Sequence, residues 1–376
     1  MRKVLKDGLG LLVMVGTISL MVVLSSVSRR DNAGKIGRVM PGYLQALMRD
    51  SRVAWKCFTL FEVLVASVAV SRLKSQRDKM SFSAAFRSLR ASWRAAGKNM
   101  KRFAISATCA VEIYEKQEGD VVVLFVPGGG WSHVDDARVW RLLPAHTHFH
   151  SFVIVEYKGY PANNGKQMAV DVGDAILWAQ ERYFDKRIVV LAHSAGAHLV
   201  ATAALSGKCE KIRALVLCGG VYDLASHRDY EHRRGVSGIS ALGAAFTDEE
   251  RKGRLSPMQE AQRLMKEENL LQEKSFPKTV FLLHGRDDRV APCQASMDFG
   301  QALRNLAKAK KWRNFKVQTN IIDKAGHDQY LRDLFIGRPH HDATGESSDP
   351  RLVAQLIEKA AFYDNNDASL LIAGCF

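Results

Sequence analysis

Short apolar runs alternate with helix-like patterns from about Phe103 to the end of the chain. Six seven-residue runs are rich in Val, Ile, Leu and Phe and read as strands buried on both faces. They are 121–127, 151–157, 187–193, 214–220, 279–285 and 317–323. Between and after them, apolar residues at helical spacing predict helices at 167–184, 195–207, 294–310 and 349–365. This alternation predicts an α/β fold, a mostly parallel sheet with helices on both faces.

The pattern before Phe103 is different. Residues 8–28 form 21 uncharged positions between Asp7 and Arg29. As a helix rising about 1.5 Å per residue, they would span roughly 30 Å, the hydrocarbon thickness of a bilayer. A cleavable signal peptide is the alternative, but its apolar region usually runs about 7–15 residues. The length therefore favours an uncleaved transmembrane helix.

Two further segments of this region have a membrane-surface character. The apolar stretch 53–70 contains Lys56 and Glu62, so it is either a poor second span or a helix in the interface, because charges are costly in lipid. In 82–101, apolar residues recur at helical spacing among five basic residues. This pattern is typical of a helix on anionic lipid headgroups. An ordinary solvated helix packed on the following domain is a compatible alternative.

The net charge of +15 is confined to the same region. Residues 1–102 hold 20 Lys and Arg against 5 Asp and Glu, whereas residues 103–376 hold 34 of each. The basic excess thus accompanies the apolar run, which favours a membrane surface over nucleic acid. Residues 29–52 carry six basic and two acidic residues, against three and one in 1–7, so the chain after the apolar run is expected on the cytosolic side. We divide the chain into 1–102, a membrane-anchoring region, and 103–376, a catalytic domain.

Ser194 stands where a predicted strand gives way to a helix, in VVLAHSAGAHLVA (189–201). Small residues around such a serine allow a sharp, strained turn that exposes a nucleophile. The signature of this turn is G-x-S-x-G, and here Ala192 replaces the first glycine. The alternative is an N-cap serine, which is common where a helix begins.

Three glycines follow the strand 121–127, in PGGGW. Gly128, Gly129 and Gly130 let backbone N–H groups approach a substrate, and with the Ala195 N–H they can form an oxyanion hole. A loose glycine-rich turn would explain the glycines but not their position at the carboxyl end of a strand, where reactive groups of such sheets lie.

An acid and a base follow two later strands. Asp288 comes just after 279–285 and His327 just after 317–323. The order Ser194, Asp288, His327 is the chain order of the α/β-hydrolase triad. In such a triad, His327 would accept the proton of the serine hydroxyl, and Asp288 would keep the His327 imidazole in the correct tautomer. Asp287 is the rival acid, but the spacing of Asp288 from the preceding strand suits the triad loop better.

The remaining histidines indicate no metal centre. His193 is expected as a variable position of the turn and His198 as a packed residue of the first helical turn. His146, His148 and His150 alternate like ligands but lack cysteine or carboxylate neighbours. We therefore predict neither a metal nor a cofactor.

Short motifs spread in order over about residues 120–340 carry a resemblance to a known group of enzymes. They are GGGW (128–131), EYKGYP (156–161), HSAGAHL (193–199), CGGVYDL (218–224), EHRRG (231–235), LSP (255–257), HGRDD (284–288) and GHDQYL (326–331). They resemble the α/β hydrolases that include isoprenylcysteine methylesterases and kynurenine formamidases, and the methylesterases most. The resemblance implies a triad of Ser194, Asp288 and His327, an oxyanion hole in the glycine loop, and a membrane-bound N-terminal region. Pro127 stands where many related esterases have a histidine, which the methylesterases also tend to lack.

These observations together predict a membrane-anchored serine carboxylesterase. Its expected reaction is hydrolysis of the α-carboxyl methyl ester of isoprenylated cysteine, on proteins or small esters, through an acyl-enzyme. Residues 221–278 are long enough to cap the pocket. We expect it in the endoplasmic reticulum membrane, with the catalytic domain facing the cytosol and no nucleic-acid partner. The alternatives are an arylformamidase acting on N-formylkynurenine, a general short-chain esterase or lipase, and a non-catalytic scaffold of the same fold.

Overall fold

A computed structural model describes residues 100–362, apart from 117–118, 133–139, 141–142, 145–150, 239, 268–269, 328–339, 342–346 and 349–351. The predicted transmembrane helix (8–28), the apolar stretch 53–70 and nearly all of the basic helix 82–101 lie outside this range. Within the described residues, no helix has the length and apolar character that crossing a membrane requires.

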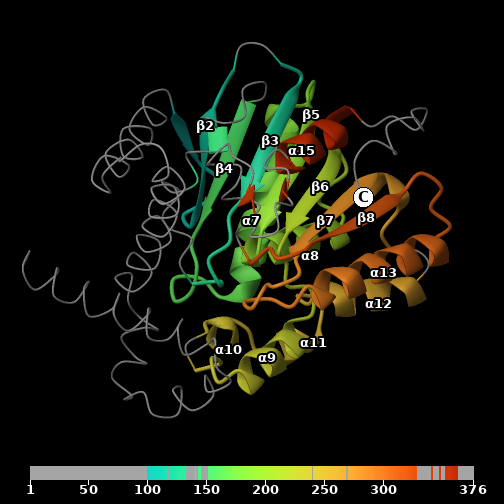
Figure 1. The fold of residues 1–376 in the computed structure, drawn as a ribbon. Helices are drawn as coiled ribbons and strands as arrows, with labels where there is room; N and C mark the ends of the chain where they lie inside the picture. The colour runs from blue at the N-terminus through green and yellow to red at the C-terminus, as the bar shows by residue number, and fades with distance from the viewer. Residues whose placement is uncertain are drawn as a thin grey trace, which may run out of the picture.

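An eight-stranded sheet forms the centre of the fold (Figure 1), with the order β1-β2-β4-β3-β5-β6-β7-β8. Its strands are β1 (Lys101–Ala104), β2 (Cys109–Tyr114), β3 (Val121–Val126), β4 (Ser151–Tyr157), β5 (Arg187–His193), β6 (Ile212–Cys218), β7 (Thr279–Gly285) and β8 (Lys316–Ile322). β1 and β2 run antiparallel to each other, β2 is antiparallel to β4, and all the other pairs are parallel. A separate two-stranded ladder joins β9 (His340–His341) to β10 (Ser347–Ser348).

Helices cover both faces of the sheet (Figure 1). They are α7 (Gly165–Arg182), α8 (Ala195–Leu205), α12 (Pro257–Lys266) and α13 (Gln294–Ala309) on one side and α15 (Leu352–Phe362) on the other. Alternate side chains of β3 enter opposite cores: Val122, Leu124 and Val126 pack with the first group, whereas Val121, Val123 and Phe125 pack on the side of α15. Burial on both faces is why this strand reads as a continuous apolar run.

The predicted α/β architecture is therefore confirmed for the part of the chain that the structure describes. Strands 151–157, 187–193 and 279–285 have the predicted bounds, and the other three begin or end within two residues of them. The hairpin of β1 and β2 was not predicted. All four residues of β1 are exposed and the buried β2 contains Glu112, which accepts a hydrogen bond from Tyr114 Oη at 2.8 Å. Neither strand therefore has an apolar run. β1 also includes two residues, 101 and 102, that the sequence assigned to the membrane-anchoring region.

The predicted cap segment, residues 221–278, divides into two parts. Helices α9 (Leu224–Arg233), α10 (Leu242–Ala245) and α11 (Asp248–Lys252) lie together beyond one end of the sheet (Figure 1). Helix α12 instead packs between α8 and α13 in the helical layer, and a short 3-10 turn, η3 (Glu273–Ser275), leads to β7. Only α9, α10 and α11 are therefore placed where a cap could lie.

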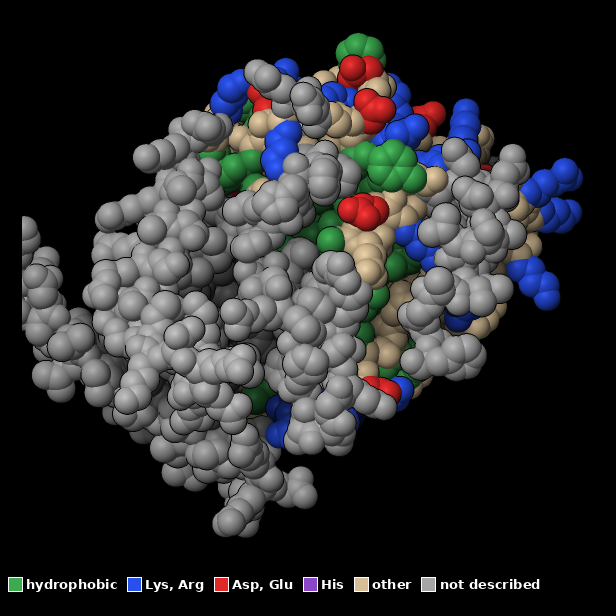
Figure 2. All heavy atoms as spheres, turned by 45° about the horizontal axis from the view of Figure 1, so that its top comes forward, with side chains coloured by type: hydrophobic (Ala, Val, Ile, Leu, Met, Phe, Trp, Pro, Cys, Tyr) green, Lys and Arg blue, Asp and Glu red, His purple; other side chains and the backbone are tan. Residues whose placement is uncertain are grey.

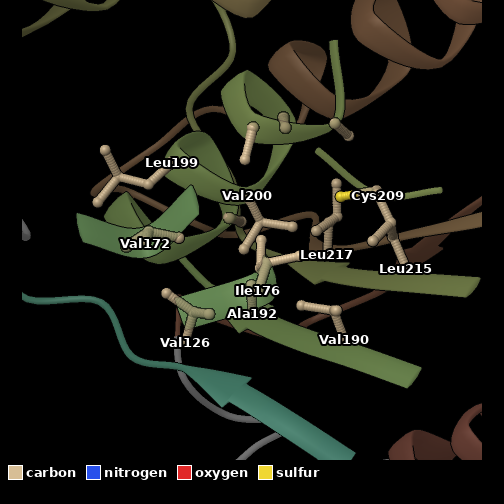
Figure 3. Packing of buried hydrophobic residues seen from close by; sticks show 14 of the residues in the cluster. Val126, Val172, Ile176, Val190, Ala192, Leu199, Val200, Cys209, Leu215 and Leu217 are labelled. Atoms are coloured by element: carbon tan, nitrogen blue, oxygen red, sulfur yellow. The ribbon is translucent and has the colours of Figure 1, made fainter. Parts of the chain in front are cut away.

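The core beneath the helix α8 is built from small and branched residues (Figure 3). Ala192 of β5 is completely buried there, in one cluster with Val126, Ile176 and Leu217. The methyl group of Ala192 thus occupies space in a packed core, where close packing stabilises the fold. The replacement of the first glycine of the motif is accommodated without a change in the strand, because Ala192 pairs in register with Val126 and Leu217.

Most charged side chains of the described region lie at its surface. In the view of Figure 2, Lys and Arg lie around its margin with Asp and Glu among them. This mixture agrees with the equal numbers of basic and acidic residues in 103–376.

Asp171 of α7 is one of several buried exceptions, since it is 1% exposed. It accepts hydrogen bonds from four side chains: Ser106 Oγ (3.1 Å), Thr108 Oγ1 (2.8 Å), Asn163 Nδ2 (2.8 Å) and Gln167 Nε2 (3.2 Å). These donors come from the β1–β2 turn, the segment after β4 and α7 itself. A buried carboxylate needs such donors to offset its desolvation. Asp171 therefore joins the unpredicted hairpin to the rest of the domain.

We expect Asp171→Ala to lower the free energy of unfolding by about 2–4 kcal/mol, because buried donors lose their acceptor. Asp174→Ala is the matched control on the same helix. Its carboxylate is half-exposed and pairs with Lys208 at 3.0 Å, an ion pair worth about 0–1 kcal/mol. Denaturant unfolding of both variants measures the difference. An equal loss of unfolding free energy in the two variants would show that the hydrogen bonds to Asp171 do not stabilise the fold more than the surface ion pair does.

Candidate active site

Ser194 stands alone between a strand and a helix. β5 ends at His193 and α8 begins at Ala195, so the serine makes the whole turn. Its φ of 52° and ψ of −120° lie in a region that side chains rarely adopt. Its side chain makes no hydrogen bond to the helix backbone, which removes the N-cap alternative. This is the strained strand–turn–helix geometry of a nucleophile elbow.

The structure brings Ser194, His327 and Asp288 together. His327 Nε2 lies 2.9 Å from Ser194 Oγ, and His327 Nδ1 lies 2.6 Å from Asp288 Oδ2. The carboxylate accepts, so Nδ1 carries a hydrogen and, in the neutral imidazole, Nε2 is free to accept the hydroxyl hydrogen of Ser194. The three side chains thus form one hydrogen-bonded chain at the carboxyl ends of β5, β7 and β8.

Asp288 is held as a buried anion. Its Oδ1 accepts the backbone N–H groups of Val290 and Ala291 at 2.8 and 2.9 Å. Burial raises the pKa of Asp288, but hydrogen bonds from His284 and His327 outweigh it and hold that pKa well below its ordinary value. Asp287, the rival acid, is exposed to solvent. The structure therefore selects Asp288 as the partner of His327.

The glycine loop lies directly against Ser194. A Cβ placed on Gly128 would come within 2.8 Å of Ser194 Cβ and 2.9 Å of the His193 carbonyl oxygen. Gly196 in the first turn of α8 is equally constrained, since its Cβ would meet the carbonyl oxygens of Val126 and Pro127 at 2.3 and 2.5 Å. Neither position has room for a side chain. The end of β3 and the start of α8 therefore approach each other closely around the serine hydroxyl.

The predicted oxyanion-hole residues border this approach. Gly129 and Gly130 continue the loop with φ of 141° and 58°, and Ala195 opens the helix α8. Backbone N–H groups in the first turn of a helix have no intrahelical acceptor, so the Ala195 N–H is available to an oxyanion. Gly128 of the loop and Ala195 of the helix thus both adjoin Ser194, and the oxyanion hole stays a prediction.

Three contacts that the sequence did not predict hold the glycine loop. Tyr157 Oη donates to Pro127 O at 3.0 Å, and the backbone N–H of Tyr160 donates to Trp131 O at 2.8 Å. Trp131 Nε1 donates to His198 Nδ1 at 3.1 Å. Tyr157 and Tyr160 belong to the motif EYKGYP, which was singled out from the sequence. The motif alone did not indicate that these residues hold the glycine loop.

Both histidines beside the serine have definite partners. His193, expected only as a variable turn position, is buried and its Nε2 donates to the backbone carbonyl of His327 at 3.2 Å. His198, expected to be packed, is completely buried, and its Nε2 donates to Leu255 O at 2.7 Å. Burial lowers the pKa of His198 to about 4, although the bond to Leu255 opposes the shift. His193 therefore fixes the base, and His198 connects the glycine loop to the cap segment.

Helix α9 brings a third buried histidine to this region. His227 is 7% exposed, and its ring lies 6.2 Å from that of Trp131 in an edge-to-face arrangement. Burial lowers its pKa to about 4, and the nearby His327 contributes in the same direction. Phe246 after α10 also packs edge-on against Trp131 at 5.8 Å. These contacts place α9 and α10 beside the glycine loop, as a cap requires.

Among the residues that the structure describes, no three His, Cys, Asp or Glu side chains are arranged to hold a metal ion. The alternating His146, His148 and His150 lie outside the described residues.

Comparison with known families is decisive for the fold. A family model described as "Alpha/beta hydrolase family" matches residues 123–356, well over half of the 376 residues. The chain belongs to the alpha/beta hydrolase family. The matched span contains the glycine loop, Ser194, Asp288 and His327. A search of curated proteins finds no match.

Solved structures of several esterases share this fold. A hyperthermophilic esterase from the archaeon Pyrobaculum calidifontis aligns with a TM-score of 0.51 and 16% identity, over 73% of this chain and 90% of its own. Carboxyl esterase 2 from the mycorrhizal fungus Tuber melanosporum aligns with a TM-score of 0.53 and 17% identity, over 70% and 87%. An arylesterase aligns with a TM-score of 0.51 and 14% identity, over 78% and 98%. At these identities the likeness shows the fold alone.

The two buried histidines of low pKa predict a loss of stability in acid. Between about pH 6.5, the ordinary pKa of histidine, and about 4, the unfolded chain binds protons that folded His198 and His227 do not. Stability should therefore fall as the pH falls through this window, by up to about 1.4 kcal/mol per pH unit for each imidazole.

Denaturant unfolding at pH 7, 6 and 5 measures this slope. We expect His227→Asn to flatten it, because one of the two imidazoles is gone. His232→Asn, which changes an exposed histidine of the same helix, is the control and should keep the wild-type slope. The same slope in both variants would contradict the assignment.

Proposed function

We propose that this alpha/beta hydrolase is a serine carboxylesterase that hydrolyses the α-carboxyl methyl ester of isoprenylated cysteine. The observation that carries the catalytic part is the hydrogen-bonded chain from Ser194 through His327 to Asp288. It is supported by the strained backbone of Ser194 and by the glycine loop against it. A scaffold without activity has no need of these three groups together.

The geometry fits acylation of the serine. Ser194 Oγ attacks the ester carbonyl carbon while its proton passes to His327 Nε2, 2.9 Å away. The carbonyl oxygen becomes an anion, which the backbone N–H groups of the glycine loop and Ala195 stabilise. Asp288 stabilises the imidazolium that forms, since it keeps its negative charge.

Collapse of this intermediate breaks the bond to the methoxy oxygen. His327 returns the proton to that oxygen and methanol leaves, so the cysteine carboxyl group stays as an acyl ester on Ser194. Water then attacks the acyl carbon with His327 again as base. The products are methanol and the free carboxylate, and the enzyme is restored.

Two observations support the prenylcysteine ester over other acyl substrates. The ordered motifs over residues 120–340 resemble those of prenylcysteine methylesterases more than those of the formamidases. The apolar run 8–28 suits a membrane anchor, and a prenyl chain partitions into membranes. A small polar formamide has no such need. The named esterases of the same fold agree with ester chemistry in general.

The place of action is part of the same proposal. The charge difference across residues 8–28 supports a catalytic domain on the cytosolic side of a membrane, for which we propose the endoplasmic reticulum. Prenylated proteins or prenylcysteine esters within that membrane would be the partners, and neither a cofactor nor a nucleic acid is required.

The substrate is tested with full-length protein in detergent or vesicles, offered farnesylcysteine methyl ester, N-formylkynurenine and p-nitrophenyl acetate. We expect methanol release from the prenylcysteine ester with the highest kcat/KM of the three. In Ser194→Ala, kcat should fall by about 10⁴-fold or more because the nucleophile is lost. Turnover of the formamide alone would replace the substrate assignment. A variant as active as wild type would end the triad assignment.

The acid is tested by a pair of neighbouring substitutions. Asp288→Asn should lower kcat about 10³–10⁴-fold, because the amide cannot accept from Nδ1 and support the imidazolium. Asp287→Asn changes the same type of side chain one residue away, in solvent, and should alter kcat less than about 3-fold. Labelling of Ser194 by a fluorophosphonate should follow the same order. The reverse order would make Asp287 the acid.

A further inference from the structure

A second imidazole contacts the triad acid. His284, near the end of β7, is completely buried, and its Nε2 lies 3.0 Å from Asp288 Oδ2. This is the oxygen that also accepts from His327 Nδ1, at 2.6 Å. The other oxygen, Oδ1, is occupied by two backbone N–H groups. The carboxylate therefore stands between two histidines.

The neighbours of His284 determine where its hydrogen lies. Nε2 is also 3.0 Å from the carbonyl oxygen of Ala291, so both of its neighbours are acceptors and Nε2 must be the donor. Nδ1 lies 2.7 Å from Ser296 Oγ of α13, and this buried hydroxyl can donate to it. The imidazole of His284 thus has a hydrogen-bond partner at each nitrogen.

We propose that His284 is a positioning residue that acts on His327 through Asp288, by sharing the negative charge of Oδ2 with it. The inference rests on the proposed function of the triad. The backbone amides fix the carboxylate, and the two imidazoles divide its remaining acceptor capacity. His284 would thereby keep Asp288 ionised. It would also make His327 a weaker base than it would be if His327 were the only imidazole bonded to Asp288.

The direction of the effect follows from electrostatics. A carboxylate that accepts a second N–H offers less negative charge to an imidazolium, so loss of His284 should raise the pKa of His327. The other groups that face this region stay in place. The His193 ring of β5 lies 4.8 Å from the His327 ring. His227 of α9, whose pKa is about 4, and the positive charge of Arg234 just after α9 also face this region. Tyr230 Oη donates to the Arg289 carbonyl beside the acid.

The test compares full-length wild type with His284→Leu, His284→Gln and Ser296→Ala. Leucine removes the donor, glutamine restores an N–H, and alanine removes the hydroxyl that contacts the imidazole Nδ1. Thr279→Val is the control, because Thr279 is a buried residue at the other end of β7. The pKa of His327 is read by NMR titration of its imidazole resonances, and independently from the acid limb of kcat/KM against pH.

We expect His284→Leu to shift both readouts upward by about 0.5–1 pH unit, a 3- to 10-fold change in proton affinity. Ser296→Ala should give a smaller upward shift, His284→Gln a value near wild type, and Thr279→Val no change. No shift, or a downward one, in folded His284→Leu and Ser296→Ala would overturn the inference.

The NMR arm separates this inference from the proposed function. If wild type hydrolyses none of the esters, the proposed function fails, but the titration of His327 still decides whether His284 acts on it. If His284→Leu does not fold, Ser296→Ala alone decides by the presence or absence of its upward shift. A fall in kcat without any shift in pKa would show that His284 only supports the fold.

Discussion

The close contact between the end of β3 and the first turn of α8 is the constraint on which the site depends. Gly196 meets the carbonyl oxygens of Val126 and Pro127, and Gly128 meets Ser194, with no room for a Cβ at either glycine. Two backbones at this separation fix the glycine loop relative to the serine without help from flexible side chains. The strained φ of Ser194 is tolerated because the strands and the buried helix on both sides hold it. A preorganised arrangement of this kind costs no rearrangement when charge develops on a substrate.

Around this contact, imidazole rings connect the elements through directed hydrogen bonds. His193 joins β5 to the backbone of His327, and His198 joins Trp131 to the cap segment. In each case one nitrogen donates to a carbonyl oxygen, which defines the tautomer. Neutral rings suit this role because they leave Asp288 as the fixed charge next to the base, and burial keeps His198 and His227 neutral at ordinary pH. Buried His198 and His227 thus add polar contacts to the site without adding charge at ordinary pH.

The sequence allowed the parallel sheet, the approximate bounds of α7, α8, α13 and α15, and the three triad positions to be predicted, because each depends on local signals. Continuous apolar runs mark strands buried on both faces, and residues after such strands meet at one edge of the sheet. The features that it did not reveal depend on contacts between distant segments. The bond from Tyr157 to Pro127, the role of His193 and the contact of His284 with Asp288 involve ordinary residues without a distinctive local pattern. The hairpin of β1 and β2 escaped because an exposed edge strand has no apolar run.

The direction of that hairpin determines at which edge of the sheet the N-terminal chain enters the domain. β2 runs antiparallel to β4 and β1 antiparallel to β2, so β1 points the same way as the parallel strands. The chain thus enters the described fold at the edge where those strands begin, opposite the edge that carries Ser194. If residues 8–28 anchor the protein, the anchor is connected to the far end of the domain through residues 29–99, a length that reaches roughly 230 Å when extended. The connecting segment would then set how closely the triad approaches a bilayer, whereas the sheet sets the chemistry. The segment and the catalytic residues could therefore change independently in evolution.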